Sequence, residues 1–598
     1  MKQLETQIAQ ALSQALQDTF QHSLPADQIN LQPTRKEFAG TFTFVTFPLT
    51  KALGKGPEQI GQALGETLAQ NAPQVAGYNV VKGFLNIEIK DSVWLQQFAE
   101  QVTGLGAGLA ETGPKRKVVV EYSSPNTNKP LHLGHLRNNF LGYSVAEILK
   151  AAGYYVVKAN LVNDRGIHIC KSMIAYEKYG QGETPQSAGI KGDHLVGKYY
   201  VEFDKAYKQE IDQLVTQGVE KEQAKKQAPL MLEAQEMLQK WEQHDPETIA
   251  LWEKMNGWVY EGFNATYQNI GVDFDKFYYE SGTYLLGKDR VEEGLEKGVF
   301  FKKPDGSVWI DLTEEGLDEK LVLRADGTSV YITQDLGTAE LKYQDFHYDQ
   351  SVYVVADEQN YHFQVLKAIL KKLGKPYADG IYHLSYGMVD LPSGKMKSRE
   401  GTVVDADELV QEMIDTARQK TDELGKIDGF TSEEAQQLYH TLAMGALKYF
   451  LLKVDPKKRM LFNPEESIDF KGNTGPFIQY THARIAAIQR KAKELGITSG
   501  AEAFAGVGTL HETEREVLVL LNYADSIIDE AARNYAPSII AQYAFDVAKA
   551  YNRFYTEVPI FQETNAQVLS FRIALSAHVA KTLKKVMGLL GISVPERM

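Results

Sequence analysis

The stretch that decides the fold is KVVVEYSSPNTNKPLHLGHLRNNF, residues 117–140. Its first six residues form a near-continuous apolar run, which predicts a strand covered on both faces, as in a parallel sheet. A polar loop follows at 123–131, and then a helix that carries Leu136, Phe140 and Val145 on or near one face. Gly153 ends the helix, and a second strand is expected at 154–159. This βαβ unit predicts a doubly wound, Rossmann-type α/β domain.

The loop between the first strand and its helix is the expected ligand site. Ligands bind at the carboxyl ends of strands in such sheets, and a helix N-terminus favours an anion there. His132 and His135 are three residues apart on the first helical turn, so both can contact one polyphosphate. Gly134 between them lets a flat ring or sugar approach the backbone. The alternative is a pair of surface histidines. A metal site is not expected, because no third ligand follows at helical spacing.

A second loop, at 387–401, carries three cations in five residues, Lys395, Lys397 and Arg399. A lysine-rich loop alone is most often solvated surface. This one follows a strand expected at 382–386, and its occurrence together with the upstream histidine loop makes the signal much stronger than either loop alone.

The length of 598 residues suggests three to five domains. Residues 1–112 are expected to form a small α/β module, with helices at 3–19 and 57–71 and strands at 41–47 and 83–89. The doubly wound domain is expected at 113–430, with a helical insertion at about 195–265 and further strands at 330–332, 352–355 and 382–386. Residues 431–598 are expected to be all helical.

Composition limits the class of protein. No run approaches the roughly 18 apolar residues of a membrane span. The single cysteine, Cys170, excludes a disulfide framework and a cysteine-based zinc site, and it favours a cytoplasmic location.

The net charge of −14 argues against a nonspecific nucleic-acid coat protein. However, residues 431–598 hold 19 Lys and Arg against 18 Asp and Glu, so this part repels a polyanion less. Its basic cluster at 453–459 is either solvated surface or a nucleic-acid contact.

The two loops together resemble the two signatures of class I aminoacyl-tRNA synthetases, and the whole chain resembles the arginyl-tRNA synthetase family. Further motifs of that family match at 123–137, 323–336, 354–363, 472–485 and 595–598. The resemblance implies that L-arginine and ATP form arginyl-adenylate and pyrophosphate, and that arginine then passes to the 3'-terminal ribose of tRNA(Arg). It also implies an N-terminal tRNA-contacting domain, a C-terminal anticodon-binding domain, Mg²⁺ held mainly by ATP phosphates, and a monomer.

The resemblance also implies the site residues. The catalytic residues are Lys129, His132, His135, Lys395 and Lys397. The ATP-binding residues are His132, Gly134, His135, Gly387, Met388, Val389, Lys395, Met396, Ser398 and Arg399. The arginine-binding residues are Glu121, Asn126, Tyr331, Asp335 and Gln359. The second signature departs from the usual pattern, since Ser398 stands where a lysine is usual. Either Lys129 or Lys397 would replace that lysine.

Most of the arginine-site residues also have a structural interpretation. Asp335 is in a first helical turn, where the helix dipole favours a carboxylate. Asn126 follows a proline in a turn, Tyr331 could pack in a strand, and Gln359 could start a helix. Glu121 differs, because a carboxylate that ends an apolar strand is costly unless it is paired. Two other functions are considered: a small adenylyltransferase, which would lack a helical C-terminal domain, and a non-enzymatic tRNA-binding relative, which would not need His132, His135 and Lys129.

Overall fold

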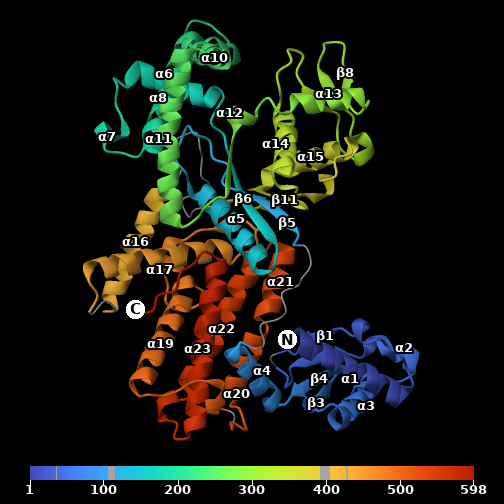
Figure 1. Ribbon diagram of the computed structural model, residues 1–598. Helices are drawn as coiled ribbons and strands as arrows, with labels where there is room; N and C mark the ends of the chain where they lie inside the picture. Colours follow the sequence, from blue (N-terminus) through green and yellow to red (C-terminus); the bar gives the residue numbers. More distant parts are fainter. Residues whose placement is uncertain (36, 105–114, 391–403, 426–428, 505) are drawn as a thin grey trace.

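The computed structural model describes residues 1–35, 37–104, 115–390, 404–425, 429–504 and 506–598. Its centre is a five-stranded parallel sheet in the order β12-β11-β5-β6-β7 (Figure 1). The strands are β5 (Lys117–Glu121), β6 (Tyr155–Val162), β7 (Lys276–Tyr279), β11 (Gln350–Ala356) and β12 (Ile381–Tyr386). This order is doubly wound, because the chain runs from β5 to one side and later returns to the other. The expected βαβ unit and Rossmann-type sheet are confirmed.

The sheet is buried on both faces, as the apolar run of β5 requires. Val118 and Val120 belong to a core that includes helix α5 (Leu133–Ala151). Val119 belongs to a second core on the opposite face, with helices α14 (Tyr331–Phe346) and α15 (Asn360–Lys372). The alternation of side chains along a strand therefore divides one valine run between two cores.

The prediction of a strand at 330–332 is wrong. Val330 precedes helix α14, which starts at Tyr331, and the Val330 N–H donates to Thr333 Oγ1 at 3.3 Å. Ile332 and Leu336 are buried one turn apart on its inner face. Three apolar residues in a row do not distinguish a strand from the first turn of a helix, and tertiary packing decides here for the helix.

Two insertions separate the strands. Between β6 and β7 the chain forms the helices α6 (Ile167–Tyr179), α7 (Pro185–Ala188), α8 (Gly192–Thr216), α9 (Lys221–Gln227), α10 (Pro229–Glu242) and α11 (Pro246–Ile270). The helical segment is thus longer than the expected 195–265. Between β7 and β11 lie α12 (Glu280–Thr283), α13 (Lys288–Glu296), α14 and a small antiparallel sheet of β8 (Phe301–Lys302), β9 (Val308–Ile310) and β10 (Lys320–Leu323).

The N-terminal module is an antiparallel sheet in the order β1-β2-β4-β3, covered by α1 (Lys2–Phe20) and α3 (Pro57–Asn71). Its strands are β1 (Leu31–Pro33), β2 (Phe42–Val45), β3 (Val75–Val81) and β4 (Phe84–Ile89), and the short α2 (Thr50–Leu53) lies between β2 and α3. Helix α4 (Asp91–Thr103) connects the module to the C-terminal helices (Figure 1). There Asp91 accepts two hydrogen bonds from the guanidinium of Arg515, at 2.7 and 3.0 Å.

The last third of the chain is helical, as expected, apart from the two-residue strand β14 (Met460–Leu461), which pairs with β13 (Val389–Asp390). The helices are α16 (Ala406–Glu423), α17 (Ser432–Leu452), α18 (Pro464–Ser467), α19 (Gly475–Glu494), α20 (Glu512–Asn522), α21 (Ala524–Asn534), α22 (Pro537–Glu557) and α23 (Ala566–Leu589). No helix in the described part of the chain has both the length and the apolar composition that a membrane crossing requires.

Candidate active site

The two histidines of the first loop cap the start of helix α5. His132 is the N-cap residue, and its Nδ1 accepts a hydrogen bond from the Gly134 N–H at 3.1 Å. His135 Nδ1 accepts one from the His132 N–H at 3.2 Å. Because each Nδ1 is an acceptor, the hydrogen of each neutral ring must be on Nε2. The backbone therefore fixes both tautomers and leaves two Nε2–H donors for a ligand.

Both imidazoles are neutral at physiological pH. Burial, and then the nearby charge of Lys129, lower the pKa of His132 to about 4, while Asp405 opposes this shift. Burial also lowers the pKa of His135 well below its usual value, with help from His132 and Lys129. Neutral donors bind phosphate oxygens without a protonation step, so the pair suits an anion that is bound throughout the neutral pH range.

Lys129 supplies the positive charge beside the pair. Its pKa is lowered from the usual value by burial. A partly desolvated ammonium attracts a phosphate more strongly than a solvated one, because the effective dielectric constant is lower. Helix α8 supports this part of the loop: a Cβ on Gly197 would lie 2.8 Å from Cδ of Pro130. Lys129 therefore has a fixed backbone and a charge placed next to both rings.

The second loop lies partly outside the described residues. Lys395, Met396, Lys397, Ser398 and Arg399 are all in the segment 391–403, so their expected roles stay predictions. The expected adenine contacts at 387–389 are described. The Gly387 N–H donates to Pro456 O at 2.9 Å, and Met388 O accepts from the Met460 N–H at 3.2 Å. A Cβ on Gly387 would come within 2.7 Å of the Arg459 N atom.

These contacts bring the basic cluster 453–459 next to segment 387–389. Arg137 of α5 donates from Nη2 to the carbonyl oxygens of Pro456 and Lys458, at 3.1 and 2.9 Å. Lys457, Lys458 and Arg459 themselves are exposed. The first helix of the βαβ unit therefore holds a cationic loop of the C-terminal region in place.

The residues expected to bind arginine occupy different environments. Glu121 ends β5 and is buried, and its Oε2 accepts a hydrogen bond from Lys342 Nζ at 2.8 Å, which provides the partner that its burial requires. Asp335 is paired with His362 Nε2 at 2.5 Å. Burial, and then the charges of Glu121 and Asp335, raise the pKa of Tyr353, so both carboxylates act on the same ring. By contrast, Asn126 and Gln359 are exposed, and Tyr331 is 79% exposed.

Sequence reasoning missed Glu280, which begins α12 directly after β7. Burial raises its pKa to about 7; Arg165 opposes the shift, and the charges of Asp164 and Asp335 add to it. A buried carboxyl group that other carboxylates influence is a candidate for binding a cation, and Arg165 already supplies one positive charge there. The signal was available, because a carboxylate directly after a strand is the pattern that singled out Glu121.

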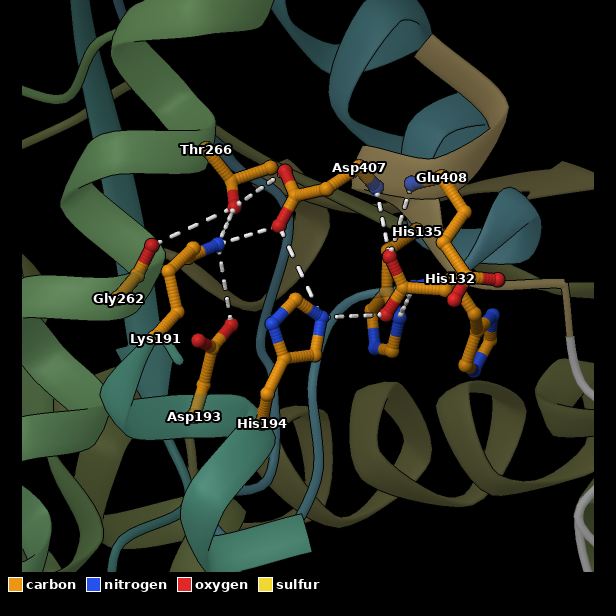
Figure 2. Close-up of polar contacts among 10 residues, drawn as sticks. His132, His135, Lys191, Asp193, His194, Gly262, Thr266, Asp407 and Glu408 are labelled. Atoms are coloured by element: carbon orange, nitrogen blue, oxygen red, sulfur yellow. Dashed lines mark hydrogen bonds and ion pairs between the residues drawn. The ribbon is translucent and has the colours of Figure 1, made fainter. Parts of the chain in front are cut away.

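A second group of charges lies beside His132, on the side of the helical insertion (Figure 2). In the part of the chain that the structure describes, His194, Asp405 and Asp407 have ligand atoms within 4.8 Å of one another, a spacing that a metal ion could use. However, the ammonium of Lys191 already binds Asp407 and lies 3.4 Å from Asp193 Oδ2. A cation of the protein itself therefore neutralises this group.

Three family models match successive parts of the chain. Residues 102–463 match the model for class I tRNA synthetases (R), catalytic domain. Residues 478–598 match the DALR anticodon binding domain, and 2–89 match the arginyl tRNA synthetase N terminal domain. The arginine–tRNA ligase of Amoebophilus asiaticus is 61% identical over 591 residues, with 99% of each chain covered. That of Bacteroides thetaiotaomicron is 56% identical over 598 residues, with 100% of each covered.

Solved structures are similar over the same length. The arginyl-tRNA synthetase of Thermus thermophilus superposes with a TM-score of 0.76 at 23% identity, with 99% of each chain covered. The enzyme of Plasmodium falciparum gives a TM-score of 0.77 at 19% identity, covering 100% of this chain and 99% of that one. At these identities the likeness concerns the fold alone.

Proposed function

The chain belongs to the arginyl-tRNA synthetase family and has arginine–tRNA ligase activity, and we propose which of its residues carry out the two steps. ATP and L-arginine form arginyl-adenylate and pyrophosphate, and arginine then passes to the 3'-terminal ribose of tRNA(Arg). The observation that carries the assignment of residues is the His132–His135 pair, whose Nε2–H donors are fixed at a helix N-terminus.

In the first step, the arginine carboxylate attacks the α-phosphorus and pyrophosphate leaves. Such transfers depend on positioning and charge stabilisation rather than on covalent help from the protein. His132 and His135 donate from Nε2 to phosphate oxygens, and Lys129 stabilises the charge that develops on pyrophosphate. Lys395, Lys397 and Arg399 add to this stabilisation of the pyrophosphate charge. Met396 and Ser398 complete the loop. Gly134 lets the nucleotide approach the helix start, and the backbone at 387–389 holds adenine.

Mg²⁺ is assigned to the phosphates of ATP rather than to a protein cage. Asp405 and Asp407, the carboxylates of the group beside His132, are already engaged: Asp405 by His194 and backbone N–H groups, and Asp407 by Lys191. These carboxylates are therefore not free to hold the ion, so Mg²⁺ would arrive with the nucleotide and keep water as its other ligands. When bound, Mg²⁺ supplies neutralising charge to the phosphates.

The guanidinium of arginine is assigned to Asp335 and Glu280. A planar group with five donors needs carboxylates in a bidentate arrangement, and these two are close enough to shift the pKa of Glu280. Tyr331 stands on the exposed rim of the same helix. Glu121, Asn126 and Gln359 are assigned to the amino and carboxyl ends of the substrate. Neutral analogues such as citrulline would leave buried acceptors unpaired, which gives discrimination without a separate editing domain.

We assign tRNA binding to the two ends of the chain, with 113–430 as the catalytic domain. Residues 431–598 would bind the anticodon. Arg484 lies over the rings of Tyr480 and Tyr555 there, at 4.9 and 5.0 Å from their centroids, an arrangement that suits stacked bases. A groove between α19 and α23 is lined by cations that suit phosphates, namely Arg490, Lys493, Lys581 and Lys584. Residues 1–112 would contact the tRNA elsewhere. We further propose a cytoplasmic monomer.

Arginine-dependent exchange of pyrophosphate into ATP, measured with and without tRNA(Arg), tests the proposal. Exchange that requires tRNA supports the assignment; no exchange under either condition excludes it, and so does exchange without arginine, which an adenylyltransferase would show. Asp335→Ala is expected to raise the arginine KM by tenfold or more and to leave the ATP KM within twofold. An unchanged arginine KM would remove Asp335 from the pocket.

A further inference from the structure

The helical insertion touches the ATP site at two places, and both contacts come from the start of helix α8. At one place, Gly197 packs directly against Pro130, next to Lys129. At the other, His194 Nε2 is hydrogen-bonded to Asp405 Oδ2 at 2.8 Å (Figure 2). His194 and Gly197 are three residues apart, so they lie on the same side of the helix.

Asp405 connects His194 to the catalytic loop through the backbone. Its neighbours form a short bridge with that loop: the Leu133 N–H donates to Val404 O at 3.1 Å, and the Ala406 N–H donates to Leu131 O at 2.9 Å. Asp405 therefore lies opposite His132 in an antiparallel pair. Its Oδ1 accepts hydrogen bonds from the N–H groups of Asp407 and Glu408, at 2.8 and 3.1 Å. The same carboxylate therefore both caps helix α16 and binds His194.

Lys191 fixes the same end of α8 to the rest of the insertion. Its ammonium binds Asp407 and lies 2.6 Å from Thr266 Oγ1 on α11. Thr266 Oγ1 also contacts Asp407 Oδ1 at 3.0 Å. The two helices approach so closely that a Cβ on Gly262 would lie 2.3 Å from Asp193 Oδ1. The start of α8 is therefore rigid, which a support for the catalytic loop requires.

We propose that His194 is a positioning residue of the adenylation site, which holds segment 404–407 across His132 while Gly197 holds the other end of the same loop. The inference rests on the proposed role of His132 and His135 at the phosphates. It assigns the inserted helix a part in ATP use rather than in arginine binding. The hydrogen bond to Asp405 raises the pKa of His194, which favours its charged form; Asp405, Asp407, Asp193 and Lys191 are the charged groups that face it.

The test is tRNA-supported pyrophosphate exchange with His194→Ala, His194→Gln and the control Lys205→Ala, which removes an exposed ion pair from the same helix. His194→Ala is expected to lower kcat/KM for ATP about tenfold while the arginine KM stays within twofold. His194→Gln keeps a donor toward Asp405 and should recover most of the loss. Lys205→Ala should match the wild type. A His194→Ala enzyme that is folded and has an unchanged kcat/KM for ATP would refute the role, as would equal losses for ATP and arginine.

Gly197→Ala provides a variant that does not disturb the charges. Alanine favours the helix and offsets part of the strain, but the added methyl group must displace Pro130 and with it Lys129. In the folded enzyme we expect a fivefold or greater loss of kcat/KM for ATP while the arginine KM stays within twofold; full activity would contradict the contact. Asp405→Asn combined with His194→Ala should lose no more than the larger single loss if both act through one contact, and additive losses would contradict that. Failure of the wild type to exchange would instead exclude the proposed function itself.

Discussion

Lowering the pH from 8 to 6 is expected to weaken arginine binding about tenfold, because Glu280 must be ionised to accept a guanidinium. Its pKa is raised to about 7 by burial and by the charges of Asp164 and Asp335. For a carboxyl with a raised pKa, the charged form that binds the substrate is present above this pKa and is lost as the pH falls through it. Relative to pH 8, the arginine KM should therefore about double at pH 7 and rise about tenfold at pH 6. The tenfold change corresponds to a loss of about 1.4 kcal/mol in the free energy of arginine binding.

The assay is tRNA-supported pyrophosphate exchange at pH 6, 7 and 8, with arginine and ATP varied in turn. The Glu280→Gln enzyme serves as the control, because every other titrating group, His194 included, is the same in both enzymes. Glu280→Gln should raise the arginine KM ten- to a hundredfold at pH 8, as expected for a lost charge-assisted hydrogen bond of about 1.5–3 kcal/mol. In this variant the pH dependence should disappear. A flat arginine KM in the wild type, or the same slope in Glu280→Gln, would refute the reasoning.

Three further substitutions test other parts of the structure. Lys129→Ala should lower the rate of exchange at least tenfold, and a near-wild-type rate would move its role to the second loop. Lys342→Met leaves the Glu121 carboxylate buried without its partner, so it should destabilise the fold by about 3–5 kcal/mol in chemical denaturation; a loss below about 1 kcal/mol would mean that another group compensates. Gly142→Ala places a Cβ 2.3 Å from a buried ring and should lower the melting temperature, whereas Gly257→Ala, which meets nothing within 4 Å, should not; equal effects would contradict the packing of α5.

The parts of the site that lie on one loop could be predicted from the sequence. Spacing alone places His132 and His135 on one helical turn, and the structure adds that each Nδ1 is used by the backbone. The βαβ unit was equally accessible, because apolar runs and helical periodicity are local signals. The prediction of a strand at 330–332 was wrong because a pattern of only three apolar residues does not decide between a strand and the first turn of a helix.

The parts that depend on distant residues could not be predicted. Lys342 pairs with Glu121 across 221 positions of sequence, and His194 pairs with Asp405 across 211. Nothing near either residue in the chain identifies its partner. Glu280 carried a local signal, a carboxylate directly after a strand, but its raised pKa comes from burial and from the charges of Asp164 and Asp335 in other parts of the chain.

The sequence by itself determined the class of fold, the order of its parts and the loop to which we assign the phosphates, because periodicity, capping and signature spacing act over a few residues. Tertiary structure alone decided how the carboxylates differ in their partners: Glu121 pairs with Lys342, and Asp335 pairs with His362. That difference depends on burial and on the nearest opposite charge, and both are set when the sheet brings the ends of β5, β7 and the start of α14 to one edge.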